Sequence, residues 1–430
     1  MNDYYGGQEA AFSLNEAEAW VEAVEHGRLR LKAMLELVIK IATATSNTTF
    51  RQASVRKHTP DVDGGPKLSF SRAYSLTLSP QLIYNRSALL PALVSSKVYQ
   101  QLEFLVVGSW WIYDHERGQS TDGSVKPMPQ TGCLRKIPSS REDVANDQSI
   151  DLRSKRNVMR FLQLAADADA HPAVIEESGS MLFRDFLSSR FKMAENLHAL
   201  FHALTLSPDP SSKTTTAFAL PRIHRHLTSI GLFGPGFGAV IPKWGGLAEI
   251  AQVACRAGAV GGGVYVLNKG IKRVERKDSV VQDEQQSPLH ELRLSEDEVV
   301  KTNKSVGSVD DLPSSEGHPK AATGAVARSI DIVSSTLDHV FPPPAEGAAP
   351  SAAAVVVFPS GSFESEAPVD ETAPIYLVIH SSDTGECPNG QSMSTLLPIS
   401  SIIPYMMTQN MEYLSTLPEL CVEDNLPLTV

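Results

Sequence analysis

Cysteine is scarce in this sequence, and the way its cysteines are spaced excludes two kinds of small stabilised domain. The four cysteines, Cys133, Cys255, Cys387 and Cys421, are far apart, and no two of them form a Cys-x-x-Cys pair. They provide neither a zinc knuckle nor a disulfide framework, and their spacing is typical of a protein from a reducing compartment. The N-terminal sequence MNDYYGGQEAAFSLNEAEAW lacks the basic and then apolar layout of a signal peptide, so we expect a cytoplasmic protein.

Basic charge and long apolar runs are lacking as well. Lys and Arg number 38 against 49 Asp and Glu, which gives a net charge of −11. Binding to a phosphate backbone needs a clustered basic surface, so the composition argues against a nucleic-acid partner. No uncharged apolar run approaches the roughly 20 residues that span a bilayer. With 42% hydrophobic and 20% charged residues, the composition is that of an ordinary soluble globular protein.

The order of the patterned segments predicts an α/β fold in which helices interrupt a strand-rich chain. EFLVVGSWWIYDHERG (103–118) is typical of a strand and a following turn, and we expect Trp110 and Trp111 to pack within that strand. Helical periodicity dominates from 143 to 230, where Asn146, Asp147 and Ser149 are candidate helix caps. Later strands are predicted for ELRL, RSIDIV, AVVVFP and PIYLVIHS. The Gly/Pro-rich stretch 231–246 predicts a domain boundary, and 341–354 predicts a low-complexity linker.

The densest glycine run, RAGAVGGGVYVLNKG at Arg256–Gly270, raises the question of a nucleotide-binding loop. A dinucleotide-binding turn places G-x-G-x-x-G after a strand and before a helix, where the helix N-terminus attracts phosphate. Gly261, Gly262 and Gly263 follow a predicted helix and precede a predicted strand, which is the reverse order. Because the C-terminal end of a helix dipole repels phosphate, we interpret these glycines as a helix stop.

The helix predicted before these glycines carries charges that an outside partner can use. Glu249 and Arg256 are seven positions apart, so they lie on one stripe together with Gln252. About 10 Å of helical rise separates the two charges, which is too far for direct neutralisation within the helix. The alternative interpretation is an ordinary solvated helix face.

Other patterns predict no catalytic, metal or cofactor site. His198 and His202 are one helical turn apart, but a zincin motif needs Glu where this sequence has Ala199, so we interpret both as packing histidines. His224 and His226 are interpreted as part of a polar helix face. No G-x-S-x-G motif occurs. From these residues alone we predict a cytosolic, strand-rich protein with a helical insertion and without catalytic residues.

Two stretches together resemble the superfamily of Rab GDP-dissociation inhibitors and Rab escort proteins. NDYYGG at Asn2–Gly7 is similar to its Asn-x-Tyr-Tyr-Gly-Gly segment. EIAQVACRAGAVGGGVYVLNKGI at Glu249–Ile271 resembles its second signature, a Glu, an Arg seven positions on, and then Gly-Gly-x-Tyr-x-Leu-Asn. Supporting similarities at 72–83, 97–113 and 136–164 follow in the family's order. The resemblance covers most of residues 1–275 and, more loosely, the strands predicted after 324.

The resemblance implies a large α/β domain, similar to flavin-dependent monooxygenases, with a smaller all-helical domain inserted into it. The implied large domain consists of residues 1–142 and 233–430, with polar insertions near 276–323 and 341–354. The implied helical domain spans 143–232. In the family the helical domain offers an apolar cleft for the geranylgeranyl chain, and in escort proteins it also docks the catalytic transferase. MLFRDFLSSRFKMAENLHALFHAL (181–204) belongs to this part of the chain.

The resemblance also implies a platform that binds the switch regions of a GDP-bound Rab GTPase. Carried over to this sequence, the platform consists of Tyr5, Glu249, Gln252, Arg256 and Val266. Val266 stands where the inhibitors have a methionine. No cofactor, metal or catalytic residue is implied.

Within the superfamily the escort branch is more similar, because of the Cys255–Arg256 pair and the polar insertions after the signature. The resemblance implies a non-catalytic accessory component. It would bind unprenylated GDP-bound Rab, present it to the catalytic heterodimer of Rab geranylgeranyltransferase, and shield the lipid during transient contact with membranes. A Rab GDP-dissociation inhibitor that recycles prenylated Rab is the alternative, and a flavin-dependent oxidoreductase is a more distant one.

Members of the superfamily begin with a strand and a glycine-rich turn ahead of the Tyr-Tyr-Gly-Gly motif. This sequence starts inside that motif, and its C-terminus is also short against the family pattern. We therefore expect a truncated or mis-spliced gene product of poor solubility, since loss of a central strand exposes unpaired backbone.

Overall fold

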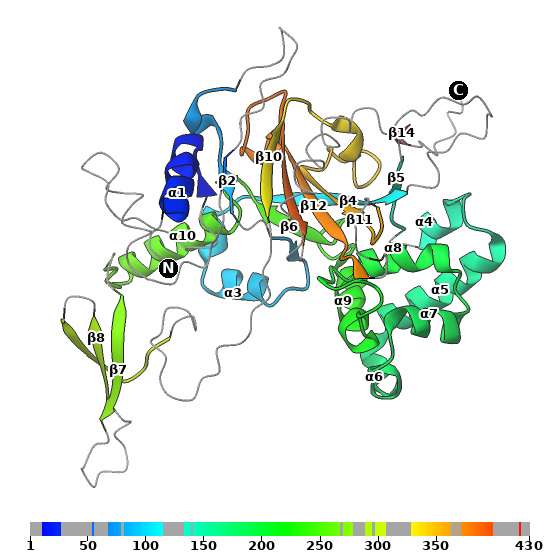
Figure 1. The fold of residues 1–430 in the computed structure, drawn as a ribbon, viewed down its shortest axis with the longest axis horizontal. Helices are drawn as coiled ribbons and strands as arrows, with labels where there is room; N and C mark the ends of the chain where they lie inside the picture. Colours follow the sequence, from blue (N-terminus) through cyan, green and yellow to red (C-terminus); the bar gives the residue numbers. More distant parts are fainter. Residues whose placement is uncertain are drawn as a thin grey trace.

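Strand β4 (Phe104–Asp114) lies in the middle of the nine-stranded sheet around which the protein folds (Figure 1). The main path of this sheet runs β10-β13-β12-β11-β4-β5-β14, and β6 pairs with both β3 and β4. The β4–β11 and β5–β14 pairs are parallel, and the other pairs are antiparallel. The other strands of the sheet are β3 (Ile83–Tyr84), β5 (Cys133–Lys136), β6 (Ala239–Pro242), β10 (Ser329–Val333), β11 (Ala353–Phe358), β12 (Ile375–Ser381), β13 (Ser392–Pro398) and β14 (Cys421–Val422).

The computed structural model describes residues 11–26, 54–55, 68–78, 81–114, 133–138, 141–266, 270–277, 289–294, 297–306, 328–362, 368, 371–398 and 421–422. Two smaller sheets accompany the large one: β1 pairs with β2, and β7, β8 and β9 form an antiparallel meander. Their bounds are Ala11–Phe12 (β1), Leu76–Thr77 (β2), Ile271–Lys277 (β7), Leu289–Leu294 (β8) and Val299–Thr302 (β9). Helix α1 (Leu14–His26) contacts β1 and η2 (Ser71–Ala73), and α3 (Leu89–Ser95) contacts η3 (Val98–Gln101).

The two tryptophans of β4 show how the sheet is buried on both faces. Trp110 and Trp111 are only 5% and 6% exposed, and as neighbours in a strand they point to opposite faces. Trp110 belongs to the core cluster shared with the helices, and Trp111 to a second cluster on the other face. There the Trp111 indole N–H donates to the carbonyl oxygen of Val340, 3.1 Å away, in the short helix η7 (Asp338–Val340). The prediction that both residues pack within a strand is confirmed.

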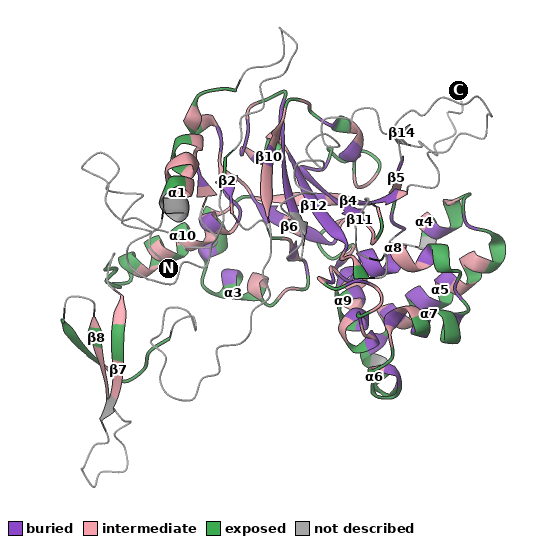
Figure 2. Ribbon diagram, viewed as in Figure 1, coloured by how far each residue is buried: buried purple, intermediate pink, exposed green. Residues whose placement is uncertain are grey.

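Strand β11 is buried at every position, and it pairs with β4 on one side and β12 on the other. Its sequence AAVVVF is a continuous apolar run, as expected for a strand covered on both faces. The centre of the sheet is accordingly the most buried part of the molecule (Figure 2). The alanine-rich end of the segment 341–354, expected as linker, therefore begins a central strand instead.

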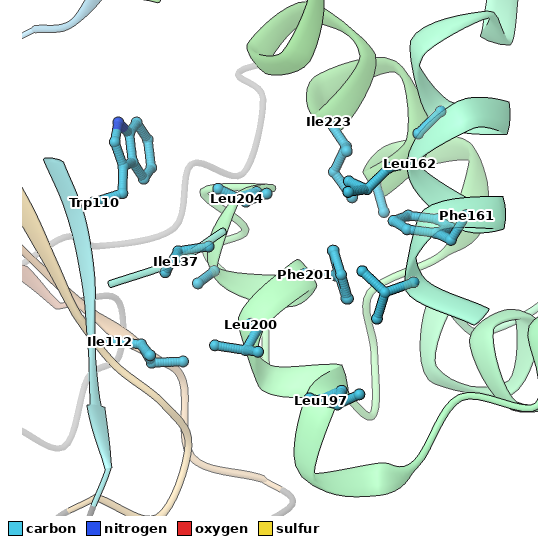
Figure 3. Close-up of a cluster of buried hydrophobic side chains, with 14 of the residues drawn as sticks. Trp110, Ile112, Ile137, Phe161, Leu162, Leu197, Leu200, Phe201, Leu204 and Ile223 are labelled. Atoms are coloured by element: carbon cyan, nitrogen blue, oxygen red, sulfur yellow. The ribbon is translucent and has the colours of Figure 1, made fainter. Parts of the chain in front are cut away.

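Helices α4 to α9 gather beside the sheet (Figure 1). In Figure 3 the side chains of Trp110 and Ile112 in β4 face Leu200 and Leu204 from the region of α8, with Phe161 behind them. Phe161 is fully buried, and its ring centroid lies 4.9 Å from that of Phe201. One continuous apolar core therefore joins the helices to the sheet. The helical elements are α4 (Arg141–Asn146), α5 (Leu152–Ala166), η5 (Ala168–Ala170), α6 (Pro172–Ser178), α7 (Phe183–Phe191), η6 (Glu195–Leu197), α8 (His198–Ala203) and α9 (Thr216–Ser229). The predicted α/β fold with a large sheet and a helical segment is confirmed.

The helix predicted across 143–170 is divided into α4 and α5, and its true cap was missed. Asp151 is the N-cap of α5, where its carboxylate accepts hydrogen bonds from the backbone N–H groups of Arg153 and Ser154 at 2.9 and 3.0 Å. Such a side chain satisfies N–H groups that the first turn of a helix leaves unpaired. Asp147, a predicted cap, instead accepts hydrogen bonds from Ser149 and from the Arg135 guanidinium.

The interpretation of His226 as part of a polar face is wrong. His226 is 2% exposed, and its ring meets Trp110 edge-on at a centroid distance of 4.8 Å, with Tyr84 at 5.9 Å. The physical reason is periodicity, since Ala219, Ile223 and His226 lie at i, i+4 and i+7 on the buried stripe of α9.

His202 is buried in α8, as the packing interpretation predicted. Its Nε2 lies 2.9 Å from the hydroxyl of Thr214, and its side chain is closed in by the helical core. Burial lowers the pKa of His202 to about 4, and it does the same to the pKa of His226. Both imidazoles are therefore neutral in the folded protein at neutral pH.

These buried histidines predict that stability falls as the pH is lowered from about 6.5 towards about 4. Between these pH values the unfolded chain binds protons that the folded protein does not. Over the whole range, each imidazole therefore lowers the unfolding free energy by about 3 kcal/mol. His202→Gln keeps a donor for Thr214 and removes one titrating group, so proton uptake on unfolding near pH 5 should fall by about one. Urea titrations at several pH values measure this slope.

The matched control is His171→Gln, because His171 is an exposed residue at the start of α6. It shows whether the loss of any histidine, rather than of the buried one, changes the slope. An identical slope for the wild type and His202→Gln would contradict the assignment of a buried neutral imidazole.

Candidate protein-binding helix

Helix α10 (Leu247–Val260) lies against β6 and η3 at the margin of the fold (Figure 1). Ala248 is its only buried residue, and Figure 2 shows the rest of the helix as half-buried or exposed. A surface helix of a globular protein normally buries an apolar stripe. Most of the surface of α10 is therefore open to an outside partner.

The glycines after α10 stop the helix, as predicted. The N–H of Gly262 donates to the carbonyl oxygen of Ala259 at 3.0 Å, and the N–H of Gly263 donates to that of Gly258 at 2.8 Å. These two bonds, with Gly262 at φ +90°, form a Schellman motif, in which glycine takes up a left-handed backbone without steric cost. Since both N–H groups are directed back into the helix, they do not form a phosphate cradle.

The strand expected directly after the glycines begins later than predicted. Val264, Tyr265 and Val266 are described without strand structure, and β7 starts at Ile271. Tyr265 folds back over the end of α10, since a Cβ at Gly258 would collide with its hydroxyl. Val264 and Val266 are 86% and 61% exposed, so they add apolar surface at the C-terminal end of the helix.

Glu249, Gln252 and Arg256 follow one another along the same stripe of α10. Gln252 and Arg256 are exposed, and Glu249 is half-buried. Within the described residues, no hydrogen bond or ion pair engages these three side chains. The structure therefore brings three of the predicted platform residues onto one accessible face, with Val266 beyond the helix end. Tyr5 lies outside the described residues.

Glu249 occupies the first turn of α10, where the helix dipole favours a negative charge. Burial raises the pKa of its carboxyl group. Its Oε1 lies close to Gly245, because a Cβ atom added to that glycine would be only 3.3 Å from this oxygen. The carboxylate is thus drawn in towards the chain that precedes the helix, while Arg256 projects into solvent two turns later.

Trp244 lies just before this helix, and the sequence patterns gave it no role. It is 54% exposed, and its backbone is left-handed with φ +79°. Tryptophan is not used as a turn residue in sequence rules, so no local signal predicts this conformation. The stretch 231–246, expected as a connection between domains, also contributes strand β6 to the large sheet.

The part of the chain that the structure describes lacks metal and membrane-spanning features. There, no group of three or more His, Cys, Asp or Glu side chains could hold a metal ion. None of the helices described has the length and apolar content needed to cross a bilayer.

The mixed sheet joined to a helical segment places the protein in the α/β class. The family described as GDP dissociation inhibitor matches residues 43–342. The chain belongs to this family. In structure it is similar to a Rab GDI from Plasmodium falciparum, with a TM-score of 0.58 at 16% identity, over 96% of this chain and 78% of that one.

Two fungal proteins named Rab proteins geranylgeranyltransferase component A are similar in sequence. The one from Saccharomyces cerevisiae is 27% identical over 365 residues, which cover 85% of this chain and 51% of that protein. The one from Candida albicans is 24% identical over 404 residues, covering 91% of this chain and 53% of that protein. The chain thus spans about half the length of these curated relatives.

The Schellman motif predicts unequal effects of two neighbouring glycine substitutions. Gly262→Ala forces a side chain into φ +90° and should lower the unfolding free energy by about 1 kcal/mol. Gly261→Ala is the matched control, because Gly261 has φ −75° and a Cβ there meets its nearest atom at 3.4 Å. Chemical denaturation and hydrogen exchange of the Gly263 amide measure the difference. Equal effects would contradict the motif.

Proposed function

We propose that this chain is a Rab escort protein, which binds GDP-bound Rab GTPases and presents them for geranylgeranylation. One observation carries the proposal: Gln252 and Arg256 are exposed and Glu249 is accessible on a helix that contributes little to the core. These residues belong to the signature that resembles the family's Rab-binding platform. The similarity to fungal proteins named component A of Rab geranylgeranyltransferase supports the escort function.

The proposed Rab-binding surface consists of Tyr5, Glu249, Gln252, Arg256 and Val266. Glu249 and Arg256 provide charges of opposite sign about 10 Å apart along the helix axis, which orient a partner with complementary charges. Val266 adds an exposed apolar contact, 61% accessible, beyond the C-terminal end of the helix. Polar contacts of this kind select a partner and fix its orientation more than they add bulk affinity.

In this proposal the chain is a non-catalytic accessory component that works in the cytosol and reaches membranes transiently. Residues 143–232 act as the helical domain, which meets the catalytic heterodimer and shields the geranylgeranyl lipid. Residues 1–142 and 233–430 act as the large domain. The supporting observation is the single apolar core between helices and sheet, because it fixes a lipid-handling part relative to a GTPase-binding part.

A Rab GDP-dissociation inhibitor is the second candidate function. The family description and the similar solved structure both carry that name, which favours it. An inhibitor of this kind extracts Rab that is already prenylated, whereas an escort protein binds Rab before prenylation. The state of the bound Rab therefore separates the two candidates.

Arg256→Ala is expected to weaken binding of a GDP-bound Rab severely while leaving the circular dichroism unchanged. Removing one partner of a close charged pair at an interface typically costs about 2–5 kcal/mol. Isothermal titration with purified Rab-GDP measures the loss. Arg160→Ala is the matched control, since Arg160 is equally an exposed helical arginine but lies on α5. An affinity unaltered by Arg256→Ala would remove α10 from the binding surface.

Prenylation separates the escort from the inhibitor. With the catalytic heterodimer and unprenylated Rab present, adding this chain should increase the transfer of geranylgeranyl to Rab. The incorporation of labelled lipid measures the transfer, and Arg256→Ala should reduce it. An absence of stimulation, with extraction of prenylated Rab from membranes, would assign the chain to the inhibitors.

A further inference from the structure

Trp244 is held in an unfavourable backbone conformation at the surface. A left-handed backbone is a true outlier for a bulky side chain, and such strain persists only where the surroundings enforce it. Here φ is +79°, and the backbone N–H donates to the carbonyl oxygen of Thr384 at 2.8 Å. The indole ring lies over Gly385, where a Cβ would collide with it. Gly385 is itself left-handed, at φ +77°. The two segments therefore fit together only with glycine at 385.

The turn beneath the ring is fixed by a buried polar network. Glu386, 2% exposed, has its carboxylate in hydrogen-bond contact with Nδ1 of His380 in β12. Its carboxylate also accepts hydrogen bonds from the hydroxyls of Thr77, at 2.9 Å, and Thr384, at 3.4 Å. Its carbonyl oxygen accepts a hydrogen bond from the N–H of Ser75 at 2.9 Å. A buried, multiply bonded carboxylate holds its neighbours rigidly, so the surface under Trp244 cannot yield.

The same network borders the start of α10. Gly246, the N-cap of the helix, lies against Thr77, since an added Cβ would come within 3.2 Å of its methyl group. Gly245 lies between Trp244 and the Oε1 of Glu249. We propose that Trp244 is a direct contact for the Rab GTPase, which extends the binding surface beyond the N-terminal end of α10. This proposal rests on the proposed function.

The chemistry of the site fits an apolar patch on the GTPase beside its contact with Glu249. Trp244 is 54% exposed, although its ring is supported from below by Gly385. The Lys243 ammonium lies 4.9 Å from the ring centroid and is paired with Glu103 at 3.0 Å, so the charge beside the ring is already matched. A rigid, exposed tryptophan loses little conformational freedom on binding, and tryptophan is enriched among residues that dominate interfaces.

The test is Trp244→Asn, because asparagine accepts a left-handed backbone and removes the ring. Affinity for a GDP-bound Rab should fall at least tenfold, with a melting temperature equal to or above that of the wild type. In the wild type, Rab-GDP should protect one tryptophan from acrylamide quenching, and Trp244→Asn should abolish that protection. Val299→Asn, at a residue 50% exposed on β9, is the control and should leave affinity unchanged.

An affinity within twofold of the wild type for Trp244→Asn, while Arg256→Ala weakens binding, would overturn this proposal and leave the proposed function standing. If neither variant weakens binding, the proposed function fails at this surface. Gly385→Ala adds a second test, because it displaces the ring. Gly385→Ala should lower the affinity for Rab-GDP when it is made in the wild type, but it should cause no further loss when it is added to Trp244→Asn. Equal losses in both backgrounds would show that the ring is not the contact.

Discussion

The parallel contact between β4 and β11 is the constraint on which the rest of the structure depends. Both strands are covered on two faces, so most of their buried side chains belong to one of two cores. Trp110 and Val355 serve the core with the helices, and Trp111 and Val356 serve the core on the opposite face. Burying one large apolar side chain contributes about 1.5–3 kcal/mol. A shift of one residue in this pairing would exchange the two faces and dismantle both cores.

Because the buried apolar residues are concentrated in and around this sheet, α10 contributes little to the core. The helix is positioned by its two ends, at Gly246 against β2 and at the Schellman motif, rather than by a buried stripe. Substitutions on an exposed face usually change stability by less than about 0.5 kcal/mol, so the polar stripe of α10 can vary at little cost to the fold. The proposed binding surface and the stabilising core thus lie on different elements.

The parts of this fold that the sequence predicts are those governed by local rules. Apolar runs predict β4, β11 and β12, and the glycines predict the end of α10. The arrangement of Glu249, Gln252 and Arg256 on one face follows from helical spacing alone. The pairing of β6 could not be predicted this way, because it depends on β4 and β3 from distant parts of the chain. The burial of His226 does follow from a local rule, the helical periodicity of α9. The conformation of Trp244 could not be predicted either. Its ring packs against Gly385, which is far along the chain, and no turn residue near position 244 indicates a left-handed backbone.

The buried pair of His380 and Glu386 is best explained by geometry rather than by stability. Hydrogen bonds inside a protein replace hydrogen bonds to water, so each one contributes only about 0.5–1.5 kcal/mol of net stability. What the pair does is fix the conformation of residues 380–386 against β2, and this surface in turn holds the left-handed backbone at Trp244. An apolar replacement could fill the same space, but it could not accept the hydrogen bonds of Thr77 and Thr384. The polar network therefore sets the orientation of the chain that enters α10, and with it the position of Glu249.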